Sequence, residues 1–222
     1  MRKKMSCLLI CLMIVCLPAC SKEPKEESVF VDITEVNEEK VPENKEEKIL
    51  TVYFSCVGEQ YQVGVIEEGN TAIVAKMISE KTGADLFEIK PIDDRYELSY
   101  SDLTDYAKKE QNEDARPEYR KEDEPDLSAY DVIFVGAPVW WGDWPMIMYS
   151  FFENNSAVLR NKTLVPFSSH GGSGLAGFDK KLGNVLKDAK ILEGLAINGV
   201  DAQNDREGTN KKVSQWLNKL GY

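Results

Sequence analysis

The segment VIFVGAPVWWGDW, residues 132–144, decides the fold class of this chain. Its first half, residues 132–137, is an unbroken apolar run, which is typical of a strand covered on both faces, as in a parallel sheet. Pro138 ends the run, and a turn that holds three tryptophans together with Gly142 and Asp143 follows. The segment therefore predicts a buried parallel strand that delivers aromatic side chains to one edge of a sheet.

Similar apolar runs on both sides of this strand alternate with segments of helical spacing. Such alternation indicates βαβ units, and therefore an open α/β fold with a parallel five-stranded sheet. Right-handed crossovers are expected, with helices on both faces of the sheet. We find no internal repeat and no second core, so residues 49–222 are expected to form one domain. The expected strands are residues 49–55, 86–89, 132–137, 163–168 and 191–197, and the expected helices are residues 71–82, 103–113, 146–153, 178–186 and 209–220.

Two further motifs lie where expected strands end. The first strand ends at Ser55 and Cys56, and Gly-Asn-Thr at residues 69–71 opens the next helix; His-Gly-Gly-Ser-Gly follows the fourth strand. Because open α/β sheets bind ligands at the carboxyl ends of their strands, we expect these motifs and the tryptophan turn to form one crevice. The candidate binding residues are Ser55, Cys56, Gly69, Asn70, Thr71, Pro138, Val139, Trp140, Trp141, Gly142, His170, Gly171, Gly172, Ser173 and Gly174.

The residue types of each motif suit a different part of a ligand. Ser55 and residues 69–71 suit a phosphate, because free N–H groups at a helix start and hydroxyl donors attract an anion. The alternative is that Asn70 or Thr71 only caps the helix. The tryptophan turn suits a flat ring, and its alternative is a role in the core or in an interface. The glycines of residues 170–174 expose amide donors, and His170 either donates to the ligand or braces the turn.

Taken together, residues 49–222 resemble the flavodoxin-like family, in a branch marked by the Trp-Trp-Gly turn and the His-Gly-Gly-Ser-Gly turn. The resemblance implies strand order 2-1-3-4-5 and FMN bound at the sheet edge. It also implies electron transfer or oxidoreductase chemistry at the isoalloxazine ring, with a redox donor and acceptor that stay unknown. The alternative is a non-catalytic flavin-binding or interaction module of the same fold.

The chain departs from the family's compact pattern between Ser55 and Gly69. An extra segment, residues 57–68, is expected to form either a flap over the ribityl phosphate or a loop that docks a partner. The neighbouring Cys56 has two interpretations. In the first, a nearby helix N-terminus lowers the pKa of its thiol. In the second, which we favour, the cysteine is there only because a small side chain fits at this position.

Two motifs of other protein classes overlap the last turn. Gly172, Gly174 and Gly177 match a dinucleotide-binding pattern, but the acidic residue that should close the next strand is missing, since Glu193 lies inside that strand. The His-Gly-Gly start is similar to an esterase oxyanion turn, but the chain has no nucleophile elbow and no second histidine.

The N-terminal part of the chain predicts a lipoprotein. Residues 1–19 have a basic start and an apolar run shorter than the about 20 residues of a membrane-spanning helix, so we expect a signal peptide. Leu-Pro-Ala before Cys20 resembles a bacterial lipobox, with lipid on Cys20; an ordinary signal with a chance cysteine is the alternative. Residues 20–48 are expected to be a disordered acidic tether, apart from a possible edge strand at 29–33.

Charge and cysteine content agree with this interpretation. Without residues 1–19 the chain keeps 24 of its 27 basic side chains against all 38 acidic ones, a net charge of −14. Nucleic acid is therefore not expected as a partner, and an acidic chain needs its lipid to stay at a membrane. We expect an anchor at the extracytoplasmic face of a bacterial cell membrane, with Cys56 as the one cysteine left free for the folded domain.

Overall fold

A computed structural model describes residues 47–222 except Leu98. The predicted signal peptide, the predicted lipid site at Cys20 and nearly all of the predicted tether lie outside the described residues. Lys48 is already attached to the domain, because its backbone N–H donates to Asp131 Oδ2 at 3.1 Å. In this described part, no helix has both the length and the apolar character needed to span a membrane.

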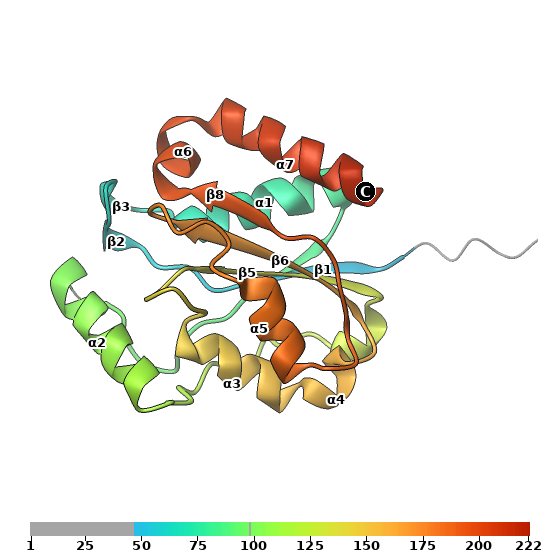
Figure 1. The fold of residues 1–222 in the computed structure, drawn as a ribbon, viewed down its shortest axis with the longest axis horizontal. Helices are drawn as coiled ribbons and strands as arrows, with labels where there is room; N and C mark the ends of the chain where they lie inside the picture. Colours follow the sequence, from blue (N-terminus) through green and yellow to red (C-terminus); the bar gives the residue numbers. More distant parts are fainter. Residues whose placement is uncertain (1–46, 98) are drawn as a thin grey trace, which may run out of the picture. The chain divides into compact units, whose positions relative to one another are not determined.

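A parallel sheet forms the centre of the domain (Figure 1). Its order is β4-β1-β5-β6, with β7 and β8 both pairing with the outer side of β6. The flavodoxin-like order 2-1-3-4-5 is thereby confirmed. The strands are β1 (Ile49–Tyr53), β4 (Asp85–Glu88), β5 (Val132–Pro138), β6 (Thr163–His170), β7 (Lys190–Ile191) and β8 (Leu195–Asn198).

The fifth strand is broken, which corrects the prediction of one strand over residues 191–197. β7 pairs with the start of β6 and β8 with its end, so Val165 and Pro166 of β6 have no partner in either. Pro166 has no N–H to donate to a ladder on this side. Gly194 fills the break, where an added Cβ would lie 2.8 Å from the carbonyl oxygen of Pro166.

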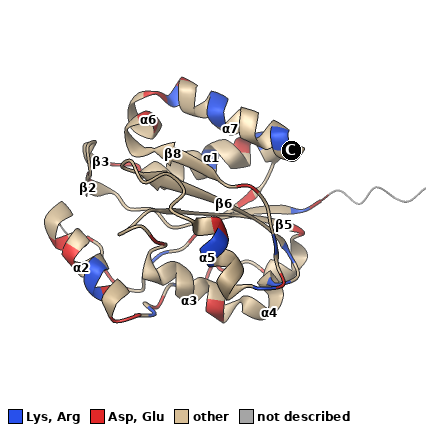
Figure 2. Ribbon diagram, in the orientation of Figure 1, with Lys and Arg blue, Asp and Glu red and all other residues tan. Residues whose placement is uncertain are grey.

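Helices cover both faces of the sheet (Figure 1). One face carries a core built with α1, α6 and α7, and the other a larger core that includes residues of α2, α3 and α5. The central strands β1, β5 and β6 contain no charged residue, and charge is gathered on the helices and connections (Figure 2). The helices are α1 (Asn70–Thr82), α2 (Tyr100–Asn112), α3 (Met146–Asn154), α4 (Ser156–Leu159), α5 (Phe178–Val185), α6 (Gly199–Asn204) and α7 (Arg206–Leu220), with a 3₁₀ turn at Leu127–Ala129.

Two helices, α2 and α7, begin three residues earlier than predicted, and α4 and α6 were not predicted. Both early starts follow a capping side chain: Ser99 accepts from the N–H of Asp102, and Asp205 accepts from the N–H of Gly208. Capping oxygens of this kind stabilise a first turn that has no apolar periodicity to reveal it.

The inserted segment forms a β-hairpin between β1 and α1. Strands β2 (Gly58–Gln60) and β3 (Gly64–Ile66) pair antiparallel in a small sheet of their own. Gln62 and Gly64 have positive φ values, +63° and +74°, which let the chain reverse within three residues. The hairpin lies at the same end of the sheet as α2 (Figure 1).

Candidate functional site

A cavity of about 340 Å³ lies at the carboxyl edge of the sheet. This volume is in the range of small-molecule sites, about 300–1,000 Å³. Its wall contains no Asp, Glu, Lys or Arg, and four of its side chains are Tyr or Trp. The lining residues are Gln60, Tyr61, Asn70, Tyr100, Leu103, Thr104, Ala107, Pro138, Val139, Trp140, Trp141, Ser169, His170, Gly171 and Gly199.

The cavity brings together part of the predicted set. Asn70, Pro138, Val139, Trp140, Trp141, His170 and Gly171 line it; Ser55, Cys56, Gly69, Thr71, Gly142, Gly172, Ser173 and Gly174 do not. The predicted site residues did not include the wall formed by the hairpin and α2, which supplies Tyr61, Tyr100 and Leu103, although the insertion was expected to form a flap or a docking loop. The insertion itself was the signal for Tyr61, and the apolar pair Leu103 and Ala107, one helical turn apart, was the signal for α2.

The start of α1 forms one end of the cavity. Ser55 Oγ accepts from the N–H of Ala72 at 3.1 Å, and Gly69 is required beside it, because an added Cβ would lie 2.1 Å from that oxygen. Ser55 therefore caps the helix, rather than Asn70 or Thr71. Among the described residues, no acceptor is found for the backbone N–H groups of Asn70 and Thr71. These free groups carry the positive end of the helix dipole.

Asn70 and Thr71 have different surroundings. The Asn70 side chain lines the cavity, and its Oδ1 accepts from Gln203 Nε2 at 2.8 Å. This hydrogen bond occupies the oxygen of the Asn70 side-chain amide and leaves its NH₂ group free to donate to a ligand. Thr71 is buried instead, with its hydroxyl 2.7 Å from that of Ser169.

The tryptophan turn is a tight hairpin. Trp140 and Asp143 exchange two backbone hydrogen bonds of 3.0 and 2.9 Å. Between them Trp141 and Gly142 have φ values of +49° and +73°, as a type I′ turn requires. The carbonyl of Gly142 accepts from Lys181, and Asp143 also pairs with Lys181 at 3.3 Å, so the turn is fixed to α5.

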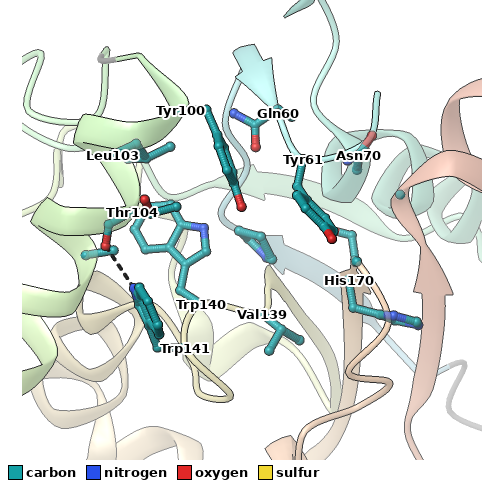
Figure 3. A pocket seen from close by; sticks show the side chains of 15 residues that line it. Gln60, Tyr61, Asn70, Tyr100, Leu103, Thr104, Val139, Trp140, Trp141 and His170 are labelled. Atoms are coloured by element: carbon teal, nitrogen blue, oxygen red, sulfur yellow. Dashed lines mark hydrogen bonds between the residues drawn. The ribbon is translucent and has the colours of Figure 1, made fainter. Parts of the chain in front are cut away.

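The three tryptophans differ in environment. Trp140 packs edge-on against Phe54 and Tyr96, with ring centroids 5.4 and 5.2 Å apart, and lines the cavity. Trp141 is 54% exposed, and its Nε1 donates to the Thr104 carbonyl at 2.8 Å (Figure 3). Trp144 is fully buried. The core interpretation is therefore correct for Trp144, and Trp140 packs against the core on one side while it lines the cavity on the other.

His170 braces its own turn. Its Nδ1 accepts from the N–H of Gly172 at 2.9 Å, and its ring points away from Trp140 and Trp141 (Figure 3). Burial lowers the pKa of His170 below its ordinary value; Lys212 adds to this effect and Asp201 opposes it. The imidazole is therefore neutral at pH 7, with the proton on Nε2. This geometry favours the bracing role among the two that were considered.

Cys56 is not an activated thiol. Burial raises the pKa of its thiol, and the nearby Glu88 carboxylate raises it further. The interpretation with a lowered pKa is wrong, because burial disfavours the charged thiolate and the Glu88 carboxylate repels it. Cys56 is the small residue that fits beside Gly69, whose Cβ would meet the Cys56 carbonyl at 2.5 Å.

The sheet order and the cavity define a flavodoxin-like fold with a small-molecule site at its carboxyl edge. A family model described as flavodoxin matches residues 48–220, and the chain therefore belongs to the flavodoxin family. A search of the curated proteins found no match.

Solved structures agree with this fold. The chain is similar to a candidate flavoprotein from Bacteroides eggerthii, with 28% identity and a TM-score of 0.61 over 79% of this chain and 99% of that one. It is also similar to a candidate flavoprotein from Bacteroides uniformis, with 25% identity and a TM-score of 0.60 over 78% of this chain and 99% of that one. A Lactobacillus acidophilus flavoprotein in complex with FMN is 20% identical, with a TM-score of 0.55 over 73% of this chain and 99% of that one.

Proposed function

We propose that this protein binds FMN in the cavity and performs electron transfer or oxidoreductase chemistry while a lipid on Cys20 holds it at the extracytoplasmic face of a bacterial membrane. Flavodoxin family membership supports the cofactor, and so does the fold shared with a flavoprotein that was solved with FMN. The motifs Trp-Trp-Gly and His-Gly-Gly-Ser-Gly support a distinct branch of the family. The observation that carries the proposal is an uncharged aromatic cavity with a helix start at one end.

The helix start fits the phosphate of FMN. The unpaired N–H groups of Asn70 and Thr71 and the Asn70 side-chain amide offer donors without a cation, and the helix dipole favours the dianion. Glu68 precedes this helix, but its carboxylate is paired with Lys76 at 2.7 Å and Arg206 at 3.0 Å. The hydrogen bond from Lys76 lowers the pKa of Glu68, and the paired charge weakly opposes an anion at the helix start.

The aromatic wall fits the ring of FMN. Trp140 and Trp141 offer large faces for stacking, and Val139, Leu103 and Ala107 supply apolar surface around them. Bound there, FMN supplies one-electron or two-electron redox chemistry at its isoalloxazine ring. The chain's own residues bind and orient the ring and keep water away from it, which strengthens each hydrogen bond that the ring accepts.

The membrane part of the proposal rests on the sequence before the domain. Leu-Pro-Ala-Cys at residues 17–20 follows a short apolar run, and residues 20–48 are long enough as a flexible coil to span roughly 30 Å. This reach keeps the domain near the membrane without contact between its acidic surface and anionic lipids.

The visible absorbance of purified residues 21–222, before and after FMN is added, tests the proposal. We expect FMN to bind with perturbed flavin bands and quenched fluorescence, because its ring stacks on indole. An unperturbed spectrum would show the alternative, an interaction module without flavin. Turnover with a quinone or a nicotinamide donor then separates an enzyme from an electron carrier.

A further inference from the structure

The inserted hairpin carries Tyr61 into the mouth of the cavity. The Tyr61 ring stacks on the ring of Tyr100, with centroids 5.9 Å apart and planes at 25°. It also contacts Gly171, where an added Cβ would lie 2.5 Å from Tyr61 Cδ1. Tyr61 therefore bridges α2 and the end of β6, which lie on two sides of the cavity (Figure 3).

A second contact holds the hairpin to α2. Glu59 Oε2 accepts from the backbone N–H of Tyr100, the first residue of α2, at 3.0 Å. A carboxylate at a helix N-terminus satisfies a free donor and interacts well with the helix dipole. The hairpin is thus fixed by a charged hydrogen bond on one strand and by an aromatic stack at its turn.

The two tyrosines present hydroxyl groups to the cavity. Both rings point with their hydroxyl ends toward the side where Val139 lies (Figure 3). Neither hydroxyl has a hydrogen-bond partner among the residues that the structure describes. Burial raises the pKa of Tyr100, and Tyr61 adds to this effect, so the Tyr100 hydroxyl keeps its proton and stays a donor. Two O–H donors in an uncharged wall suit a flat ligand that carries accepting oxygens.

We propose that Tyr61 and Tyr100 form an aromatic clamp that covers the ring end of the bound flavin and slows its release. The inference rests on the proposed function, because it takes the isoalloxazine as the ring that the clamp covers. A protein that holds its cofactor without a covalent bond outside the cytoplasm depends on slow release to stay loaded. The clamp acts on the ring and not on the phosphate, so FMN and riboflavin gain equally from it.

The release rates of FMN and riboflavin, followed by flavin fluorescence in residues 21–222, test the clamp. Tyr61→Ala is expected to release both ligands about tenfold faster, the size of a lost aromatic contact. Tyr61→Phe keeps the ring and loses only the hydroxyl donor, so its release rate should lie between those of the wild type and Tyr61→Ala. Val65→Ala is the matched control, since Val65 is on the same hairpin, 80% exposed and absent from the cavity wall.

Gly171→Ala gives an independent test, because its methyl group displaces Tyr61 without removing any side chain. It should accelerate release in the wild type and add nothing in a Tyr61→Ala background. Equal acceleration in both backgrounds would overturn the clamp, as would a wild-type release rate in Tyr61→Ala. Those two results leave FMN binding intact, whereas a wild type that binds no FMN overturns the proposed function as well.

Discussion

The hydroxyls of Thr71 and Ser169 lie 2.7 Å apart, and both residues are buried. This hydrogen bond joins the first turn of α1 to the end of β6, 98 residues away. It lies at the edge of the sheet where the cavity opens. The Thr71 side chain thus connects the two elements that form the site, while its backbone N–H is free to face a ligand.

Thr71→Val should lower the free energy of unfolding by about 1–3 kcal/mol, because it leaves the buried Ser169 hydroxyl without a partner. Urea denaturation measures this loss. The double variant Thr71→Val with Ser169→Ala should lose less than the two single losses added together, since no hydroxyl is then stranded. Unchanged stability of Thr71→Val with a selective loss of FMN affinity would instead show that the side chain binds the phosphate.

Asn70→Ala should weaken FMN more than riboflavin, because the Asn70 amide is expected to donate to the phosphate alone. A hydrogen bond to a charged group is worth about 1.5–3 kcal/mol, and fluorescence titration of the two ligands measures the difference. Gln203→Met is the matched variant, because it removes the hydrogen bond that orients the Asn70 amide. It should also weaken FMN more than riboflavin, but by less than Asn70→Ala does. Equal losses for FMN and riboflavin would place the phosphate elsewhere.

His170 should make stability depend on pH. Its pKa in the folded chain is lowered from 6.5, so below pH 6.5 the unfolded chain takes up a proton before the folded chain does. The contribution of neutral His170 to the free energy of unfolding is therefore fully present above pH 6.5 and is lost as the pH falls through the lowered pKa. Protonation of Nδ1 also breaks the bond from the Gly172 N–H.

His170→Asn is the control for this effect, because an Asn oxygen can accept from the same N–H without titrating. Melting temperatures of the two proteins should separate as the pH falls below 6.5. His170 is the single histidine of the chain, which simplifies the assignment. Parallel melting curves across this window would show that His170 does not titrate with folding.

Cys20→Ser should release the protein from membranes, because lipidation at Cys20 is the proposed anchor. The wild type should stay in the membrane fraction after a high-salt wash, since attachment through an acyl chain does not depend on charge. Cys16→Ser, a change inside the predicted signal peptide, serves as the control and should stay membrane-bound. A Cys20→Ser protein that still resists the wash would contradict the anchor.

Local patterns predicted much of the fold. The apolar run at residues 132–137 is a strand, α1 and α3 lie within a residue of their expected bounds, and the tryptophan turn follows β5. The strand order came from the family resemblance, because apolar runs alone do not say which strands are neighbours. The helix starts at Tyr100 and Arg206 were missed, since a single capping side chain marks each one.

The sequence by itself determined the α/β class and the motifs at the strand ends, because each depends on residues close together in the chain or on strand-length runs. Tertiary structure alone decided which of the predicted residues reach the cavity and that the hairpin and α2 complete its wall. Tyr61 meets Gly171, and Thr71 meets Ser169, only after the sheet has assembled. Such contacts depend on the packing of distant segments, so no spacing within the chain records them.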